Sequence, residues 1–440
     1  MSDNINKQFN NYLWAYILVA LSGCLGNVVD GIIVGNLINE DGVSAINLSK
    51  PINQFIFTLH LLINAGAGML VAYALGKQNI TDARRFFTRA LTLSVGMGLL
   101  LTIVGGVLFP AETARLLCSN EQILPLARDY MQVLLLGNPA FILMWGLSTM
   151  VGVDGQPKLV SVAVIIDNAV NLFLDIVFIQ WLGWGITGSS AATVVGHLVG
   201  IAILLSHWRH HKRLQLDFSF DGLQPSVRRI ISQGAPLAVA SISLTLLLLS
   251  ANTIVLSTLG RTGIFAFAVC MNLLQVYNLF LSGTCQTLQS LGAIQVGKGN
   301  ADGLRVVLRK AFRFITVAMA VTCVFVWIDP QAIAALFGAD EPDMIHETDH
   351  ALRIFALSFI PFCYIYVLMI VYKLYGHHKM ALFISFALSL TVIPVLWAVS
   401  KLAPEYLWYS YLIAYIIEVL LIVLFHSIGR IKFELPGSPA

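Results

Sequence analysis

The sequence has 440 residues, of which 58% are hydrophobic and 11% are charged, and its formal net charge is +3. Soluble domains carry about 25% charged residues. This composition excludes an ordinary soluble protein and indicates an all-α polytopic membrane protein. Apolar segments fill the chain nearly end to end and leave no room for a separate catalytic domain. We therefore expect no enzymatic activity and no nucleic-acid partner.

Twelve apolar segments are long enough to cross a bilayer as helices, which takes about 20 residues each. An even number places both termini on the same side of the membrane. With both termini inside, 20 of the 26 Lys and Arg residues fall in inner segments, as is typical of cytoplasmic loops. The predicted spans cover residues 12–38, 52–75, 90–110, 130–153, 159–180, 186–206, 232–259, 264–296, 311–328, 352–375, 381–400 and 406–428.

The two halves of the chain repeat each other at an offset of 221 residues. The segment G-K-Q-N at 76–79 follows the second span, and G-K-G-N at 297–300 follows the eighth. The repeat predicts two six-helix bundles related by pseudo-two-fold symmetry. We expect an N-terminal lobe at 1–206, a basic cytoplasmic linker at 207–231 and a C-terminal lobe at 232–440. Parallel repeats of this kind are a transporter architecture that works by alternating access.

The most polar stretch inside a predicted span runs from Ile165 to Asp175. Asp167, Asn171 and Asp175 are four residues apart and Asn168 lies beside them, so all four share one face of a helix. A carboxylate at the bilayer centre costs roughly 2.5–3.5 kcal/mol. This face should therefore line protein or water, which makes it the leading candidate for the path of a polar solute. Asp167 lies nearer the cytoplasmic end, where a helix-start or interfacial role is the alternative.

A second intramembrane acidic residue, Asp30, lies in the first span, three residues after Asn27. If Asp30 and Asp175 lie close together, their charges repel each other, and either a bound H+ or a bound Na+ would relieve the repulsion. The sequence does not separate these two couplings. Asn27 is expected to line the same cavity, as is Asn168. The alternative for Asp30 is a polar residue in a face of close helix packing, because Gly31 is followed at helical spacing by another glycine.

Other polar residues inside the spans have less specific patterns. His60 and Asn64, four residues apart in the second span, either line the cavity or serve in packing. His197 and Glu418 are single polar residues for which we expect an interhelical hydrogen bond, and a second titrating site is the alternative for Glu418. An uncharged stripe in the eighth span is interpreted as a wetted cavity wall. It consists of Gln275, Asn278, Ser282, Gln286 and Gln289.

One motif points to a different class of protein. Residues 346–350 read H-E-T-D-H, which satisfies the H-E-x-x-H pattern of metalloprotease zinc helices. A zinc site also needs a third ligand and a cleft that excludes water. This copy falls in a predicted acidic outer loop at 340–350, where a chance match is easy. We expect a solvated loop there, and a membrane metalloprotease is the distant alternative.

Several segments resemble the MATE (multidrug and toxic compound extrusion) family, and the resemblance covers nearly the whole chain. V-D-G-I-I-V-G-N-L at 29–37 resembles the V-D-T-x-x-V-G-x-L pattern of the family's first helix. N-L-F-L-D-I-V-F-I at 171–179 is similar to N-x-x-L-D-x-x-F-I of its fifth helix. G-S-S-A-A-T at 188–193 is similar to the G-x-x-x-A-T that follows, and D-G-Q-P-K at 154–158 matches a D-G-x-P-K turn.

The resemblance implies a MATE/MOP-type fold of twelve helices that exports organic cations, drugs or metabolites in exchange for H+ or Na+. It implies that Asp30, Asn171, Asp175 and Thr193 form the cation-coupling site, which could hold Na+. We expect no structural metal and no cofactor besides the coupling ion. The absence of acidic residues from spans seven and ten favours the DinF-like or MepA-like branch of the family.

The expected partners are the lipid bilayer and a small, cationic, amphipathic substrate. We expect a monomer in the bacterial cytoplasmic (inner) membrane. The nearest rival function is a lipid-linked oligosaccharide flippase of the same superfamily, which would need a cationic cavity for pyrophosphate. The predicted spans hold almost no Lys or Arg, so this rival is disfavoured.

Overall fold

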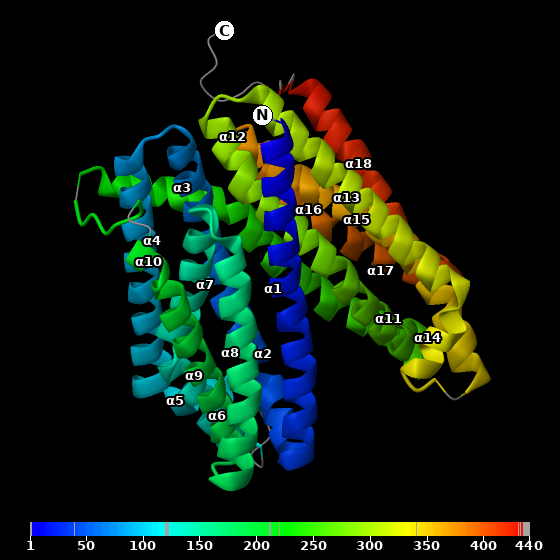
Figure 1. Ribbon diagram of the computed structural model, residues 1–440. Coiled ribbons are helices and arrows are strands. Elements are labelled where there is room, and N and C mark those ends of the chain that lie inside the picture. The colour runs from blue at the N-terminus through cyan, green and yellow to red at the C-terminus, as the bar shows by residue number, and fades with distance from the viewer. Residues whose placement is uncertain are drawn as a thin grey trace. The chain divides into compact units, whose positions relative to one another are not determined.

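A computed structural model describes residues 2–38, 40–118, 123–210, 213–219, 221–339, 341–429, 431 and 433, and within them it is built from helices without strands (Figure 1). Short π-helical or 3-10 segments carry the label η. The elements before residue 211 are α1 (Ser2–Leu37), α2 (Glu40–His60), η1 (Leu61–Ala65), α3 (Gly66–Gly76), α4 (Ile80–Leu101), η2 (Thr102–Leu108), α5 (Pro110–Arg115), α6 (Leu124–Leu136), α7 (Asn138–Val153), α8 (Pro157–Ile176), η3 (Val177–Trp181), α9 (Ile186–Leu205) and α10 (His207–His210). The later elements are α11 (Leu223–Thr287), η4 (Leu288–Gly292), α12 (Ala293–Gly297), α13 (Ala301–Ile328), α14 (Pro330–Leu336), α15 (Pro342–Leu374), α16 (His378–Leu390), α17 (Val392–Leu402), η5 (Pro404–Tyr406) and α18 (Tyr409–Ile428).

The chain forms two compact units. One unit holds Trp14–Gly234, and the other holds Met1–Leu13 together with Ala235–Ala440. We call them the N-terminal unit and the C-terminal unit. The helices α1 and α11 each contribute residues to both units. The predicted lobe boundaries stay a prediction, because compactness does not define the ends of a repeat.

The described residues contain ten helices that are long and apolar enough to cross a membrane. The pair α6 and α7, bent by 48° at its break, makes an eleventh span. The helical stretch Leu223–Gly297 has 75 residues, and at 1.5 Å per residue it would be roughly 110 Å long, several times a bilayer's thickness. Gly260 interrupts it with a non-helical backbone (φ 64°). Divided there, the stretch gives two spans and the set reaches the twelve predicted.

Several helices begin earlier than their predicted spans. The predicted spans at 90–110 and 311–328 belong to α4 and α13, which start about ten residues sooner, at Ile80 and Ala301. Each start is capped in the same way: the Asn79 side chain accepts from the Asp82 backbone N–H, and the Asn300 side chain accepts from the Gly303 N–H. Hydropathy marks only the part of a helix that lies in lipid, whereas capping sets where the helix begins.

The repeat seen in the sequence is also a repeat of local backbone structure. Gln78 and Gly299, at equivalent positions before the two Asn caps, have φ values of 60° and 65°. Gly155 and Gly376 occupy equivalent turns with φ values of 99° and 82°. A positive φ is rare outside glycine, so Gln78 holds a conformation that its counterpart adopts without cost. Both halves therefore use the same turns between the same spans.

Pro139, Pro236, Pro361 and Pro394 fall inside the predicted spans, and proline inside a helix is expected to kink it. Pro139 lies at the start of α7, directly after the 48° bend. Pro236 and Pro361 lie within the continuous helices α11 and α15, and Pro394 lies near the start of α17. A further proline, Pro51, lies inside α2. Of these prolines, Pro139 therefore agrees best with the expected kink.

The interior of the N-terminal unit brings α7, α8 and α9 close together. Apolar residues of all three form one buried cluster, which includes Met144, Val160 and Leu204. Small residues on α9 allow the approach: a Cβ atom on Gly196 would lie 2.7 Å from Asp167 Oδ1, and one on Gly200 would lie 2.6 Å from Met144 Cε. Small residues serve this purpose in membrane helices, where van der Waals packing drives association. This packing places the polar face of α8 against α9.

The segment predicted as a linker packs onto the N-terminal unit rather than standing free. Arg89 on α4 is buried and donates to the Ser226 hydroxyl group and to the Asp221 carbonyl oxygen. Arg84, on the same helix, donates to the Arg213 carbonyl oxygen at 2.9 Å. The Thr88 hydroxyl group accepts from the backbone N–H group of this segment at 2.7 Å. The segment's described residues are therefore fixed to one helix by several independent hydrogen bonds.

Candidate functional site

The polar face of α8 points into the N-terminal unit. Asp167, Asn171 and Asp175 are all buried, and Asp175 is 0% exposed. Asn168 is only half-buried. The helix starts with Pro157 at its first turn, where a missing N–H costs nothing. The stripe predicted from four-residue spacing thus lies along the protein-facing side of one helix.

Asp30 on α1 meets Asp175 on α8. Their carboxyl groups are close enough to share a hydrogen bond when one of them carries a proton. The Ser189 hydroxyl group of α9 is also close to Asp175. However, both Asp175 oxygens and the Oδ1 atom of Asp30 are buried without a hydrogen bond of normal geometry. The structure therefore brings together the two acidic residues singled out in the sequence and leaves their buried oxygens unsatisfied.

A residue near this pair, Tyr130, and its partner Ser49 could not be found from the sequence. Tyr130 on α6 is buried and close enough to interact electrostatically with both carboxyl groups. Its hydroxyl group forms a side-chain hydrogen bond with Ser49 of α2, which is also buried. Tyr and Ser are common in apolar helices, so neither residue gave a signal. The acidic pair thus has the hydroxyl groups of Tyr130 on α6 and Ser189 on α9 near it, and Ser49 of α2 holds the first of them.

Asn171 and Thr193 form a second contact of the site. Asn171 Nδ2 donates to Thr193 Oγ1 at 3.2 Å, and the Thr193 hydroxyl group donates to the Ser189 carbonyl oxygen at 3.1 Å. The other polar atom of this side chain, Asn171 Oδ1, is an amide oxygen and can only accept hydrogen bonds or bind a cation. One helical turn separates Asn171 from Asp175. All four residues expected to form the coupling site therefore lie in one region of α1, α8 and α9.

Asp167 lies at the other end of the stripe and has its own partner. His197 Nδ1 is 2.9 Å from Asp167 Oδ2 and 3.0 Å from Oδ1. This contact across α8 and α9 confirms the predicted interhelical hydrogen bond of His197. Asp167 is thus paired with His197, about two helical turns away from Asp175 on α8, and is not part of the acidic pair.

The predicted cavity-lining residues of the N-terminal unit are dispersed. Asn168 donates to Ser22 Oγ at 2.9 Å, which joins α8 to α1, and Asn27 is exposed. Asn64 is fully buried and accepts from the Ser94 hydroxyl group at 3.0 Å. The His60 ring lies 5.3 Å from the ring of a tryptophan on α7. The contacts of His60 and Asn64 are thus with α4 and α7, and their role as cavity residues stays a prediction.

The uncharged stripe of the C-terminal unit follows α11. Gln275 is exposed and Asn278 is half-buried. Gln286 Nε2 donates to Ser282 Oγ at 2.9 Å, so these two residues partly satisfy each other. The stripe stays a predicted cavity wall.

Two charged residues of the C-terminal unit are buried. Lys373, near one end of the predicted span 352–375, lies on α15 with 1% of its surface exposed. Glu418 on α18 was expected to form an interhelical hydrogen bond, yet both its carboxyl oxygens are buried without a partner. The prediction for Glu418 was wrong because a sequence does not show which neighbour faces a buried side chain.

The H-E-x-x-H motif is not in a loop, as was predicted, but in the first turns of α15. Glu347 accepts from Trp408 Nε1 at 2.6 Å, and Asp349 forms an ion pair with Arg353 at 3.0 Å. The described residues contain no cluster of three or more His, Cys, Asp or Glu side chains that could hold a metal ion. Asp340, at the start of the predicted acidic loop, lies outside the described residues. The motif therefore has the helix of a zinc site but lacks a third ligand among the described residues.

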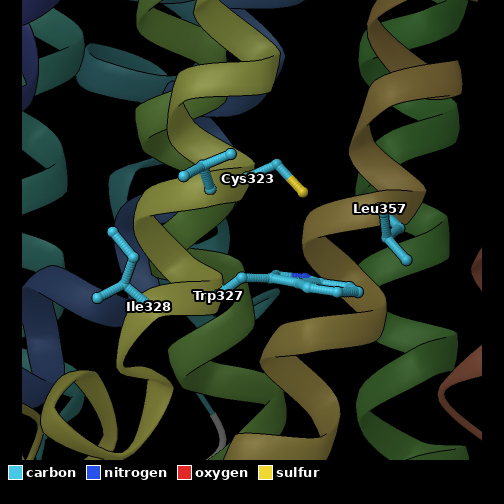
Figure 2. A pocket seen from close by; sticks show the side chains of 5 residues that line it. Cys323, Trp327, Ile328 and Leu357 are labelled. Atoms are coloured by element: carbon cyan, nitrogen blue, oxygen red, sulfur yellow. The ribbon is translucent and has the colours of Figure 1, made fainter.

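An apolar groove between α13 and α15 is a separate surface feature of the C-terminal unit. Figure 2 shows the Trp327 ring reaching from α13 toward Leu357, with Cys323 and Ile328 on the same helix. Val324 completes the lining, and 75% of Ile328 is exposed. An exposed apolar surface of this kind is expected where a helix faces lipid. None of the predicted site residues lines this groove.

Comparison with known proteins identifies the family. The MatE family profile matches residues 16–177 and 236–398, which is most of the chain and one copy in each half. The chain belongs to the MatE family. This match confirms the resemblance noted in the sequence. It also confirms the prediction of a multi-pass membrane protein related to multidrug efflux transporters.

Curated relatives of this MatE protein are named as exporters. It is 22% identical over 396 residues to the multidrug export protein MepA of Staphylococcus haemolyticus, covering 88% of this chain and 86% of that protein. It is 22% identical over 435 residues to the probable multidrug resistance protein YoeA of Bacillus subtilis, covering 94% and 92%.

Solved structures share the fold. A mutant of the Vibrio cholerae MATE transporter VcmN aligns with a TM-score of 0.90 at 17% identity, covering 99% of each chain. A MOP superfamily transporter from Pyrococcus furiosus aligns with a TM-score of 0.84 at 18% identity, covering 97% of each chain. At these identities the likeness concerns the fold, and it confirms the expected MATE-type architecture.

Proposed function

We propose that this protein is a secondary active antiporter that exports cationic, amphipathic small molecules in exchange for H+ or Na+. The observation that carries the proposal is the contact between Asp30 and Asp175. Their carboxyl groups come from different helices and meet inside the N-terminal unit, where no described residue forms a hydrogen bond of normal geometry with the two Asp175 oxygens. Two ionised carboxylates so placed repel each other and lack hydration. A site of this kind gains stability when it takes up a cation.

The proposed coupling follows from charge. When the pair is ionised, it offers negative charge that attracts a cationic substrate. When a proton or Na+ binds, the charge falls and so does the attraction for the substrate. A cation that binds one state of the protein better than the other shifts the balance between the states, and the linkage is reciprocal. The Oδ1 atom of Asn171 and the Ser189 hydroxyl group, both near Asp175, are further oxygens that Na+ could use.

We further propose that the protein works as a monomer in the cytoplasmic membrane of a bacterium. The excess of Lys and Arg in alternate loops supports placing both termini in the cytoplasm. The two halves matched by the family profile support alternating access, in which one half rocks against the other.

An export assay tests the proposal. Cells that express the protein are loaded with ethidium, an amphipathic organic cation, and its efflux is followed by fluorescence. We expect Asp30→Asn and Asp175→Asn to abolish efflux while the protein stays folded in the membrane. Asp129→Asn is the matched control, because Asp129 lies on α6 of the same unit but is exposed and paired with Arg128. Undiminished efflux by either of the first two variants would refute the site.

The coupling ion is assigned in liposomes that contain the purified protein. A pH gradient and a Na+ gradient are imposed separately, and ethidium transport is measured under each. Transport driven by only one gradient names the ion. If neither gradient drives transport by the wild type, the antiport proposal fails, whatever the role of the acidic pair.

A further inference from the structure

The C-terminal unit contains an acidic side chain that the proposed coupling does not use. Glu418 lies in the middle of α18 and is 0% exposed. Neither of its carboxyl oxygens has a hydrogen-bond partner in the part of the chain that the structure describes. Buried polar groups nearly always have partners, so an unpaired buried carboxyl group calls for an explanation.

The surroundings of Glu418 are mostly aromatic and apolar. On α18, the buried Tyr415 is close enough to interact electrostatically with it. The Tyr415 ring lies 5.6 Å from that of Phe362 on α15. Two turns beyond Glu418, Phe425 packs at 4.6 Å against Phe383 of α16. Glu418 lies between these ring contacts along α18, in a stretch held against α15 and α16 by aromatic packing.

Among the described residues, no Lys, Arg or His forms an ion pair or hydrogen bond with the Glu418 carboxyl group. The titratable or charged residues on the elements packed against α18 are Asp343, His346, Glu347, Asp349, His350, Arg353, Cys363, Tyr364, Tyr366, Tyr372 and Lys373 of α15, His378 and Lys379 of α16, and Lys401 of α17. Of these, Tyr372 is hydrogen-bonded to His426, at the far end of α18. Among the cations in this set, Lys373 is the best candidate for an ion pair with Glu418, because it is also buried. Its electrostatic neighbours, however, are Cys285 and His378. The described residues thus give Glu418 neither an ion pair nor a hydrogen bond.

An ionised carboxylate in such a place is costly. Moving one charge from water into the protein interior costs several kcal/mol even after the surroundings relax. A proton removes this cost without needing any further ligand. A metal cation needs several oxygen ligands, whereas the described contacts on either side of Glu418 are made by aromatic rings. The ligand that fits is therefore a proton.

We propose that Glu418 is a proton-binding site of the C-terminal unit, occupied in the conformation described here and emptied when this part of α18 is exposed to water. The site lies in a different unit from the Asp30–Asp175 pair. Its use in transport rests on the proposed antiport function, whereas the occupancy of Glu418 by a proton does not. The proposal gives each half of the molecule its own titrating carboxyl group.

Infrared difference spectroscopy tests the occupancy directly. Purified protein in lipid is taken from near-neutral to alkaline pH, and the loss of the C=O band of protonated carboxyl groups is recorded. We expect Glu418→Gln to lack one component of this loss. Glu405→Gln should keep it, because Glu405 is exposed on η5. Asp175→Asn should also keep the Glu418 component. An identical loss in the wild type and in Glu418→Gln would overturn the proposal.

A second variant guards against misfolding. Glu418→Asp keeps a carboxyl group on a shorter side chain, so its band should move in frequency and remain pH-sensitive. An unmoved band would also overturn the assignment. The infrared result is independent of transport: absence of ethidium efflux with the Glu418 band intact counts against the antiport function alone. If both hold, Glu418→Gln should carry fewer protons per exported ethidium in liposomes than the wild type.

Discussion

Asp154 anchors the segment between the two halves of the chain, and its removal should destabilise the N-terminal unit. Asp154 lies in the turn between α7 and α8 and is buried. Its Oδ2 atom is 2.8 Å from His207 Nε2, and both side chains are fully buried. Its Oδ1 atom accepts from Arg213 Nε at 3.1 Å. The substitution Asp154→Ala removes both contacts at once.

The magnitude follows from the burial of each partner. Breaking a buried pair by removing one member costs about 3–5 kcal/mol, whereas an exposed pair contributes about 0.2–1 kcal/mol. His207 belongs to the first kind, and Arg213, whose side chain is 58% exposed, belongs to the second. Together the two contacts give an expected loss of about 3–6 kcal/mol. For a unit of this size, 1 kcal/mol corresponds to about 2–4 °C, so the unfolding midpoint should fall by about 6–24 °C.

Thermal unfolding of purified protein in detergent, followed by tryptophan fluorescence, measures this effect. Arg213→Ala is the matched control and should lower the midpoint by no more than about 4 °C, since it removes only the exposed contact. Asp154→Asn keeps one acceptor oxygen and should fall between the two. If Asp154→Ala lowers the midpoint no further than Arg213→Ala, the reasoning from burial is refuted.

Three further outcomes are expected. Gly234→Ala should prevent folding, because the new Cβ atom would lie 1.9 Å from the Leu62 carbonyl oxygen, whereas Gly23→Ala, with nothing within 4 Å, should be tolerated; membrane yield and size-exclusion profiles distinguish them. Asn171→Ala should weaken ion coupling without abolishing folding, since it removes the bond to α9; efflux at several ion concentrations shows this. His346→Ala should leave the zinc content of the purified protein unchanged and substoichiometric, as measured by atomic absorption.

The sequence could predict features that follow from the free-energy cost of placing charged groups in a bilayer. Burying carboxylates in a bilayer is costly, so the polar face of α8 had to point inward, and it does. The repeated turns at 76–79 and 297–300 could also be recognised in the sequence, because positive φ values favour glycine and helix caps favour Asn. These features depend on local chemistry and on depth, both of which a sequence carries.

The partners of buried groups could not be predicted in the same way. Tyr130 lies near the acidic pair and is bonded to Ser49, but both contacts depend on how α2 and α6 pack. Glu418 shows the converse, because an expected hydrogen bond is absent. The motif at 346–350 was assigned to a loop on account of its charge, although charge does not prevent the first turns of a helix. In each of these cases the outcome depends on residues that are distant in the sequence and adjacent in the fold.

The central claim is that Asp30 and Asp175 act together as one cation-binding site that opposes substrate binding. Its most direct test is ethidium binding to purified protein, measured at acidic and near-neutral pH, each with and without Na+. The account predicts that acid or Na+ weakens binding by the wild type, and that neither does so in Asp30→Asn or Asp175→Asn. A dependence on pH and Na+ that is the same in the wild type and in both variants would contradict it.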